Sequence, residues 1–303
     1  MYLYHFGISE LPFTLTPNTS YYYGLPTHKE ALQVLNTALQ SGEGFIKVTG
    51  EVGTGKTLLC RKLLNELPDY FVSAYIPNPF LSPEELRRSV AKELGVELGE
   101  HSDQQEFTQR IQEKLIAINQ SGKAVVLVID EAQALPVESL EVLRLFTNLE
   151  TESRKLLQVV LFGQPELDEK LSRSDLRQLR QRITFSYSLD KMDLDQLYHY
   201  VKHRLTVAGY RGVEVFNRGV CKELFKATLG TPRMVNVLCH KCLMLAYGEG
   251  AEAVSKKHMQ LAIKDTDACI QTPRFNWYYA FGLMLVLAIA TGGWFYAKGV
   301  GLV

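Results

Sequence analysis

The sequence predicts an α/β fold, in which a parallel sheet covered by helices is followed by a small all-helical domain. Three observations carry this prediction. Short apolar runs typical of buried strands alternate with segments of helical periodicity over residues 41–190. A glycine-rich loop joins the first of these strands to the helix that follows it. After Leu189 no further strand pattern occurs, and residues 191–270 show helical periodicity with capping signals.

Five segments are predicted to be strands. Each is a short apolar run, and residues 124–129 are apolar throughout, which is typical of a strand buried on both faces of a parallel sheet. Because helical segments separate consecutive strands, the sheet is expected to be parallel. The predicted strands are residues 45–49, 70–76, 124–129, 156–162 and 183–188.

The helices are delimited by capping residues. Pro68 closes the helix that follows the glycine loop, and Ser82 with Glu85 forms a capping box at the start of the next one. Asp193 and Gln196 form a second box where the helical domain begins. Further helices are expected over residues 103–119, 137–149 and 217–228, and from Pro232 and Ser255.

Residues 50–57 form the pattern G-x-x-x-x-G-K-T, which is the phosphate-binding P-loop. Its glycines allow the backbone N–H groups to turn toward a β-phosphate. Lys56 is expected to reach the β- and γ-phosphate oxygens, and the Thr57 hydroxyl to ligate Mg²⁺. The sequence therefore predicts binding of ATP with Mg²⁺ by Gly50, Glu51, Val52, Gly53, Thr54, Gly55, Lys56 and Thr57.

Two acidic residues follow the third strand. Asp130 and Glu131 stand at its C-terminal tip, which is the edge where open α/β sheets bind their ligands. Asp130 is placed to hold Mg²⁺ through water, and Glu131 to orient and deprotonate an attacking water. Adjacent acids at this position favour hydrolysis over transfer to a small acceptor. Together with the P-loop they predict an ATPase.

Composition narrows the choice of partners and compartment. The 33 Lys and Arg residues equal the 33 Asp and Glu residues, so the net charge gives no indication of a nucleic-acid partner. The five cysteines lack a paired framework, which favours a reducing compartment. Cys239 and Cys242 share an apolar helical face and are predicted to be buried thiols rather than metal ligands.

Residues 275–297 carry no charge over a length sufficient to cross a bilayer. The two tryptophans of the chain, Trp277 and Trp294, stand near its ends, as interfacial anchors do. Basic residues are concentrated on its N-terminal side, which predicts a single-pass span with the larger part of the chain in the cytoplasm. Residues 298–303 would form a short tail on the far side.

These motifs together resemble the AAA+ ATPases of the ExeA/GspA type, which occur with bacterial secretion and type IV pilus machines. The resemblance covers nearly all of residues 1–270, and it rests on GEVGTGKT, VIDEAQ, FGQPEL, HRL before AG, and GTPR. It implies an AAA+ core over residues 41–190, a helical lid over 191–270, and a segment 1–40 that borders the nucleotide.

The same resemblance implies a location and partners. The expected location is the bacterial inner membrane, and the expected partners are further copies of the chain in a ring and proteins of a pilus or type II secretion machine. Members of this type continue past the membrane into a peptidoglycan-binding region. The present sequence has none, so direct binding to the cell wall is not expected.

The resemblance also implies roles for individual residues. Gln164 corresponds to the polar sensor at the tip of the fourth strand, and Arg233 to the lid arginine near the nucleotide. Arg180 or Arg182 is expected to act as an arginine finger on the neighbouring subunit. The segment 21–24 either borders the adenine together with His28 or packs as a loop.

Two other functions stay open at this point. One is a DNA-associated regulator of the transposition type, which the neutral net charge and the expected anchor disfavour. The other is a nucleotide-gated scaffold that binds ATP with little turnover.

Overall fold

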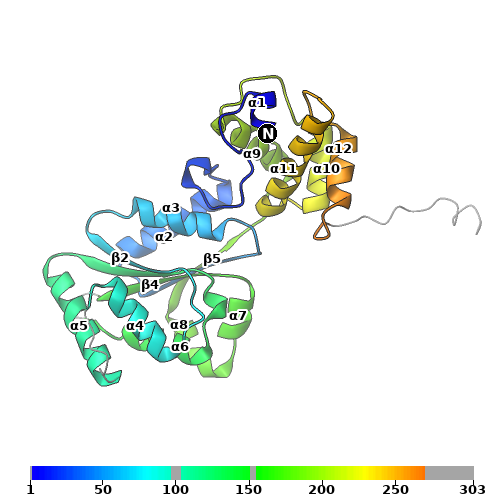
Figure 1. Cartoon of the computed structure of the whole chain (residues 1–303). Coiled ribbons are helices and arrows are strands. Elements are labelled where there is room, and N and C mark those ends of the chain that lie inside the picture. The colour runs from blue at the N-terminus through cyan, green and yellow to red at the C-terminus, as the bar shows by residue number, and fades with distance from the viewer. Residues whose placement is uncertain (1, 97–103, 151–154, 270–303) are drawn as a thin grey trace, which may run out of the picture. The chain divides into compact units, whose positions relative to one another are not determined.

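The computed structural model describes residues 2–96, 104–150 and 155–269, which form a parallel sheet between helices and a second, helical region (Figure 1). The prediction of an α/β fold is confirmed. The expected membrane span, 275–297, and the tail, 298–303, lie outside the described residues. Within the described ranges, no helix is both long and apolar enough to cross a bilayer.

The sheet contains five strands, and all neighbouring strands are parallel. They lie in the order β2-β3-β4-β1-β5. Because β1 lies beside β4 and β4 lies beside β3, the C-terminal ends of these three strands meet at one edge. Their bounds are β1 Phe45–Gly50, β2 Phe71–Ile76, β3 Ala124–Ile129, β4 Leu157–Gly163 and β5 Ile183–Leu189, close to the predicted ones.

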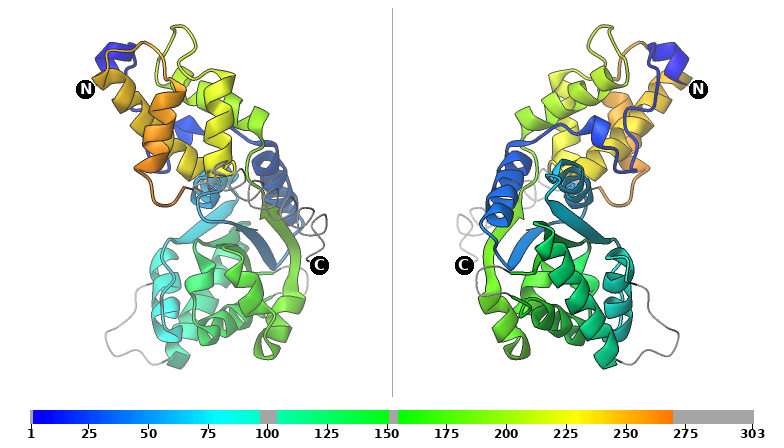
Figure 2. Two further views of the ribbon diagram at one scale, coloured as in Figure 1. Left: turned by 90° about the vertical axis from the view of Figure 1, so that its right-hand side faces the viewer. Right: turned by 90° about the vertical axis from the view of Figure 1, so that its left-hand side faces the viewer.

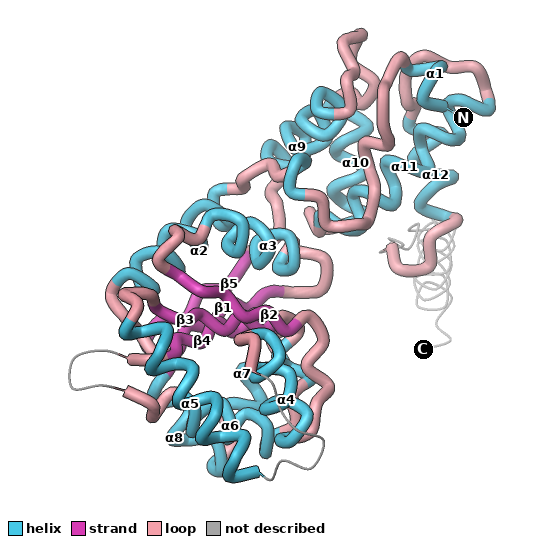
Figure 3. The backbone as a smooth tube through the Cα atoms, turned by 60° about the vertical axis from the view of Figure 1, so that its left-hand side comes forward, coloured by secondary structure: helices cyan, strands magenta, loops and turns pink. Residues whose placement is uncertain are grey.

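Helices cover both faces of the sheet, and Figure 3 shows the strands between the two groups. One face is covered by α2 (Pro26–Gln40) and α3 (Lys56–Glu66); the other is covered by α4 (Pro83–Glu93), α5 (Gln104–Gln120), α6 (Val137–Phe146), α7 (Glu166–Leu171) and α8 (Arg177–Arg182). In β3, Val126 and Val128 belong to the first core, while Val125 and Leu127 belong to the second. Both faces of this strand are therefore buried, which explains its continuous apolar sequence.

The helical region after β5 has a core of its own. It contains α9 (Leu194–Val207), α10 (Arg218–Thr228), α11 (Pro232–Gly248) and α12 (Lys256–Lys264). The predicted capping boxes at Ser82 and Asp193 are both formed. Thr231 is the N-cap residue of α11 but makes no capping hydrogen bond through its side chain.

The N-terminal segment is divided between two cores. Helix α1 (Tyr2–Phe6) lies beside α11, as Figure 2 shows, and the Tyr2 hydroxyl is 2.8 Å from His240 Nδ1. Phe13 also belongs to the core of the helical region, whereas Leu35 of α2 packs against the sheet. Residues 2–40 therefore do not pack as one unit.

All five cysteines are buried and form no disulfide, and the predicted burial of Cys239 and Cys242 is confirmed. Burial raises the pKa of Cys242 to about 12, and its Sγ lies 3.8 Å from Met259 Sδ. Cys239 is fully buried in the same core. These thiols are apolar packing groups, because burial keeps them protonated at neutral pH.

Gly230 joins the helical region to the segment that leaves the sheet. Its φ is +75°, and an added Cβ would lie 1.9 Å from the carbonyl oxygen of Met192. We expect Gly230→Ala to lower the free energy of unfolding by about 3 kcal/mol, because backbone must move to remove the clash. Gly250→Ala is the matched control, since Gly250 has a φ of +67° but nothing within 4 Å. Equal unfolding free energies for the two variants, measured by urea titration, would contradict the role of the close contact.

Candidate active site

The P-loop connects β1 to α3 through two glycines in the left-handed region. Gly53 has a φ of 80° and Gly55 a φ of 100°. His28 of α2 supports this turn, because its Nε2 donates to the carbonyl oxygen of Thr54 at 3.0 Å. An added Cβ at Gly55 would lie 3.0 Å from His28 Cε1. The buried imidazole of His28 thus supports the loop. A side chain at position 55 would require this imidazole or the loop to move.

Lys56 is a buried cation at the start of α3, with 4% of its surface exposed. Its Nζ donates to the carbonyl oxygens of Gly50 at 2.7 Å and Glu51 at 2.9 Å. Burial lowers its pKa, and the carboxylates of Glu131 and Asp130 partly oppose this shift. Within the described part of the chain Lys56 forms no ion pair, so its charge suits an anionic ligand.

Asp130 and Thr57 are brought together from two different elements. Asp130 is 2% exposed, and its Oδ1 accepts the backbone N–H of Glu131 at 2.9 Å. Burial raises its pKa, while hydrogen bonds from the Thr57 hydroxyl and from Glu131 oppose the rise. A hydroxyl and a carboxylate oxygen are ligands that suit Mg²⁺, which usually takes one or two protein groups with phosphate oxygens and water. In the described ranges no cluster of three or more His, Cys, Asp or Glu side chains could hold a metal alone.

Glu131 is held at the end of β3 by two amide side chains. Its Oε2 accepts from Gln164 Nε2 at 2.9 Å and from Gln133 Nε2 at 2.6 Å. Burial alone would raise its pKa, but these hydrogen bonds and the charge of Lys56 lower the pKa below its ordinary value. Glu131 is therefore ionised at neutral pH. Sequence reasoning missed Gln133 as a site residue, although it stands two positions after Glu131 in VIDEAQ.

The helical region reaches the P-loop through the start of α11. The backbone N–H of Arg233 donates to the carbonyl oxygen of Gly53 at 3.2 Å. An added Cβ at Gly53 would lie 2.6 Å from Arg233 Cβ, so only glycine permits this approach. The guanidinium of Arg233 is exposed and has no hydrogen bond or ion pair with any described residue.

Residues of the P-loop, of the ends of β3 and β4 and of the start of α11 line one cavity of about 260 Å³. Its wall includes Lys56, Thr57, Glu131, Gln164 and Arg233, and these lie with Val52, Gly53 and Gly55 of the P-loop and with residues 14–18. Asp130 is not among the described lining residues, although Glu131, whose backbone N–H donates to Asp130 Oδ1, is one of them.

The tyrosines of the segment 21–24 are not among the described lining residues of this cavity. Tyr22 stacks on His28 with ring centroids 6.0 Å apart. Tyr21 lies 4.5 Å from the guanidinium carbon of Arg204. Of the two interpretations left open by the sequence, loop packing is therefore the one that these contacts support.

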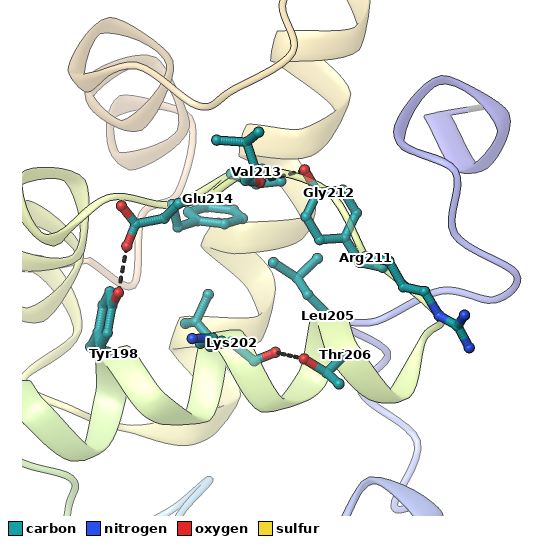
Figure 4. Close-up of a pocket in the computed structure, with 12 residues that line it drawn as sticks. Tyr198, Lys202, Leu205, Thr206, Arg211, Gly212, Val213 and Glu214 are labelled. Carbon is teal, nitrogen blue, oxygen red and sulfur yellow. Dashed lines mark hydrogen bonds between the residues drawn. The ribbon is translucent and has the colours of Figure 1, made fainter.

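A second cavity, of about 390 Å³, lies in the helical region between α9 and residues 210–216 (Figure 4). Val201, Leu205 and Phe216 give it apolar walls, and the Tyr198 hydroxyl donates to Glu214 at its side. No helix begins among its described lining residues, and its lining glycine, Gly212, lies in a loop. The phosphate-binding elements are all at the smaller cavity.

Comparison with known proteins agrees with this geometry. Residues 39–171 match the family described as AAA domain. The matched residues run from the end of α2 to α7, so the match includes the P-loop, Asp130, Glu131 and Gln164.

The chain is also similar to General secretion pathway protein A of Aeromonas hydrophila. The two are 40% identical over 298 residues, which cover 97% of this chain and 54% of that protein. The chain thus spans about half the length of this relative.

Solved structures with low sequence identity share the fold. Cdc6p of Pyrobaculum aerophilum has a TM-score of 0.67 and 18% identity, with 84% of this chain and 70% of that chain covered. The ORC2 protein of Aeropyrum pernix has a TM-score of 0.63 and 14% identity, with 92% and 80% covered. These similarities concern the fold alone.

The two arginines expected near a subunit boundary differ in their environments. Arg182 is half-buried, and its guanidinium donates to the Arg144 carbonyl at 3.2 Å and to the Thr147 hydroxyl at 3.1 Å. Arg180, on the same helix α8, is exposed. It has no hydrogen bond or ion pair with the residues that the structure describes.

Proposed function

We propose that this protein is a membrane-attached ATPase, which binds ATP with Mg²⁺ and hydrolyses it to assemble or remodel a bacterial secretion or pilus complex. The observation that carries the proposal is the convergence of Lys56, Thr57, Glu131 and Gln164 on one cavity. A buried cation, a hydroxyl, a carboxylate and an amide from three strand ends are the groups that phosphoryl transfer to water needs.

Each side chain has a role that follows from its contacts. Lys56 would exchange its two carbonyl partners for phosphate oxygens, which bind an ammonium more strongly. Glu131 would accept the proton of the attacking water, since its ionised carboxylate lines the cavity. Gln164 would orient that water. Thr57 and Asp130 would hold Mg²⁺, whose charge neutralises the phosphates when it is bound.

The membrane and the partners are supported by the sequence relationship. The chain is related to General secretion pathway protein A, and residues 275–297 have the length and charge pattern of a single span. We therefore propose attachment to the inner membrane with the AAA domain in the cytoplasm. Among relatives of this type, the ATPases of mannose-sensitive haemagglutinin pilus biogenesis are the ones that we propose as its nearest functional counterparts.

Purified full-length protein in detergent provides the test. We expect release of phosphate from ATP that requires Mg²⁺, and retention of the protein in membranes washed with alkaline carbonate. Turnover of zero would overturn the ATPase proposal, and release by carbonate would overturn the membrane attachment. Salt-dependent binding of duplex DNA together with that release would favour the DNA-associated alternative.

The arginine finger gives a prediction that separates the two candidates. The side chain of Arg180 is exposed, whereas the guanidinium of Arg182 donates to the carbonyl oxygen of Arg144 in α6. We therefore propose that Arg180 is the residue that reaches a neighbouring subunit. Arg180→Ala should preserve ATP binding and lower turnover by about 10²-fold. Mixing it with Glu131→Gln subunits should restore part of the activity, since interfaces with both intact residues form again.

Arg173→Ala is the charge-matched control, because Arg173 is exposed and pairs with Asp175 at 2.8 Å. Its turnover should equal that of the wild type. Failure of every mixture to regain activity would remove the role of Arg180 across a boundary. Loss of turnover in Arg182→Ala with unchanged thermal stability would instead assign the finger to Arg182.

A further inference from the structure

Glu131 combines a constrained backbone with a constrained side chain. Its φ is 52°, which places a non-glycine residue in the left-handed region. Residues in this region persist where surrounding contacts fix them, and they concentrate at functional sites. The side chain is fixed by the amide groups of Gln133 and Gln164, both of which donate to Oε2. The position of the carboxylate is thus determined by the hydrogen bonds from these two neighbouring side chains.

The orientation of the Gln133 amide follows from its contacts. Its Oε1 accepts the backbone N–H of Gln164 at 3.0 Å. Because a backbone N–H can only donate, the oxygen of the amide must face Gln164, and the nitrogen must face Glu131. Gln133 therefore joins the end of β3 to the end of β4 with both ends of one side chain.

The backbone of Gln133 is held independently of its side chain. Lys170 of α7 donates through Nζ to the carbonyl oxygens of Gln133 at 2.5 Å and Leu135 at 2.6 Å. Residues 132–134 form a short 3-10 helix, and the N–H of Ala134 donates to the Glu131 carbonyl at 2.9 Å. Loss of the Gln133 amide should therefore leave this turn in place while removing one of the two hydrogen bonds that hold the Glu131 carboxylate.

We propose that Gln133 is a positioning residue for hydrolysis, which holds the Glu131 carboxylate against the tip of β4. This inference rests on the proposed ATPase function. Gln133 is not among the described residues that line the cavity, so its effect on the reaction passes through Glu131 and Gln164. The expected consequence is a change in kcat without a change in ATP affinity.

Two substitutions separate the contacts of this amide. Gln133→Met keeps the length of the side chain and removes both hydrogen bonds. Gln133→Glu can still accept from Gln164, but it cannot donate to Glu131 and brings a second negative charge beside it. Since a misplacement of about 1 Å can cost about 10²-fold in rate, we expect kcat to fall by about 10–10²-fold in both variants.

The decisive measurement is a double-mutant cycle on the full-length protein with Glu131→Gln. If Gln133 acts through Glu131, Gln133→Met should slow turnover of the wild type but add little in the Glu131→Gln background. A residue with only a structural role would slow both backgrounds by the same factor. Gln109→Met is the matched control, since the amide of Gln109 donates to the Glu113 carboxylate at 2.9 Å on the exposed surface of α5.

The outcomes distinguish this inference from the proposed function. Equal factors in both backgrounds, an unchanged kcat, or a change confined to ATP affinity would each overturn the role of Gln133 while leaving the ATPase in place. Absence of turnover in the wild type would overturn the proposed function, and the role of Gln133 with it. Thermal unfolding of both Gln133 variants checks that they fold, and either folded variant suffices for the cycle.

Discussion

Replacement of Glu131 by glutamine should slow ATP hydrolysis by about 10²–10⁴-fold while ATP binding is preserved. The change keeps the shape of the side chain, and its remaining carbonyl oxygen can still accept from Gln164 and Gln133. It removes the negative charge that would take up the proton of the attacking water. Single-turnover measurement of phosphate release, with ATP affinity measured in parallel by calorimetry, separates the two effects.

Glu138→Gln is the matched control for this prediction. Glu138 lies in the first turn of α6, seven positions after Glu131, and its side chain is exposed. The Glu138→Gln protein should hydrolyse ATP at the wild-type rate. A Glu131→Gln protein that hydrolyses ATP within a few-fold of the wild-type rate would place the general base on another residue.

The secondary structure could be predicted because local sequence determines it here. The capping box of Ser82 and Glu85 and that of Asp193 and Gln196 are formed as predicted, since each requires only residues three positions apart. The apolar run 124–129 identified β3 at its observed bounds, because burial on both faces of a strand favours apolar residues along its length.

The packing of the N-terminal segment could not be predicted, because it depends on contacts between distant residues. Tyr2 meets His240, and Arg204 donates through Nε to the carbonyl oxygen of Pro12 at 2.6 Å. No periodicity within residues 1–25 indicates such partners. Of this segment, residues 14–18 are among the described residues that line the cavity.

In the candidate site, too, the features set by local sequence could be predicted, and those set by contacts between distant residues could not. The P-loop and the acidic pair were predicted because their chemistry requires fixed spacings within one strand and its following turn. The bond between Gln133 and the Gln164 backbone depends on the adjacency of β3 and β4, which is a property of the sheet order. The difference between Arg180 and Arg182 likewise depends on the position of α6, to which one of the two is bound.

Removal of the Lys56 ammonium should abolish ATP binding at ordinary nucleotide concentrations. In Lys56→Ala the phosphates lose two charge-assisted hydrogen bonds, which contribute roughly 1.5–3 kcal/mol each, so the affinity should fall by about 10²–10⁴-fold. Lys56 is suited to bind an anionic ligand, because its ammonium is buried beside the P-loop carbonyls and has no carboxylate partner among the described residues.

Thermal unfolding with and without nucleotide measures this loss directly. A ligand present at 100 times its dissociation constant stabilises a folded protein by about 2.7 kcal/mol, and this gain should vanish in Lys56→Ala. Lys62→Ala is the control, since Lys62 lies on the same helix and pairs with Glu66 at 2.7 Å outside the cavity. If both variants kept the nucleotide-dependent stabilisation, the phosphates would be bound elsewhere, and the catalytic roles of Thr57, Asp130 and Glu131 would lose their basis, because each depends on a phosphate at the P-loop.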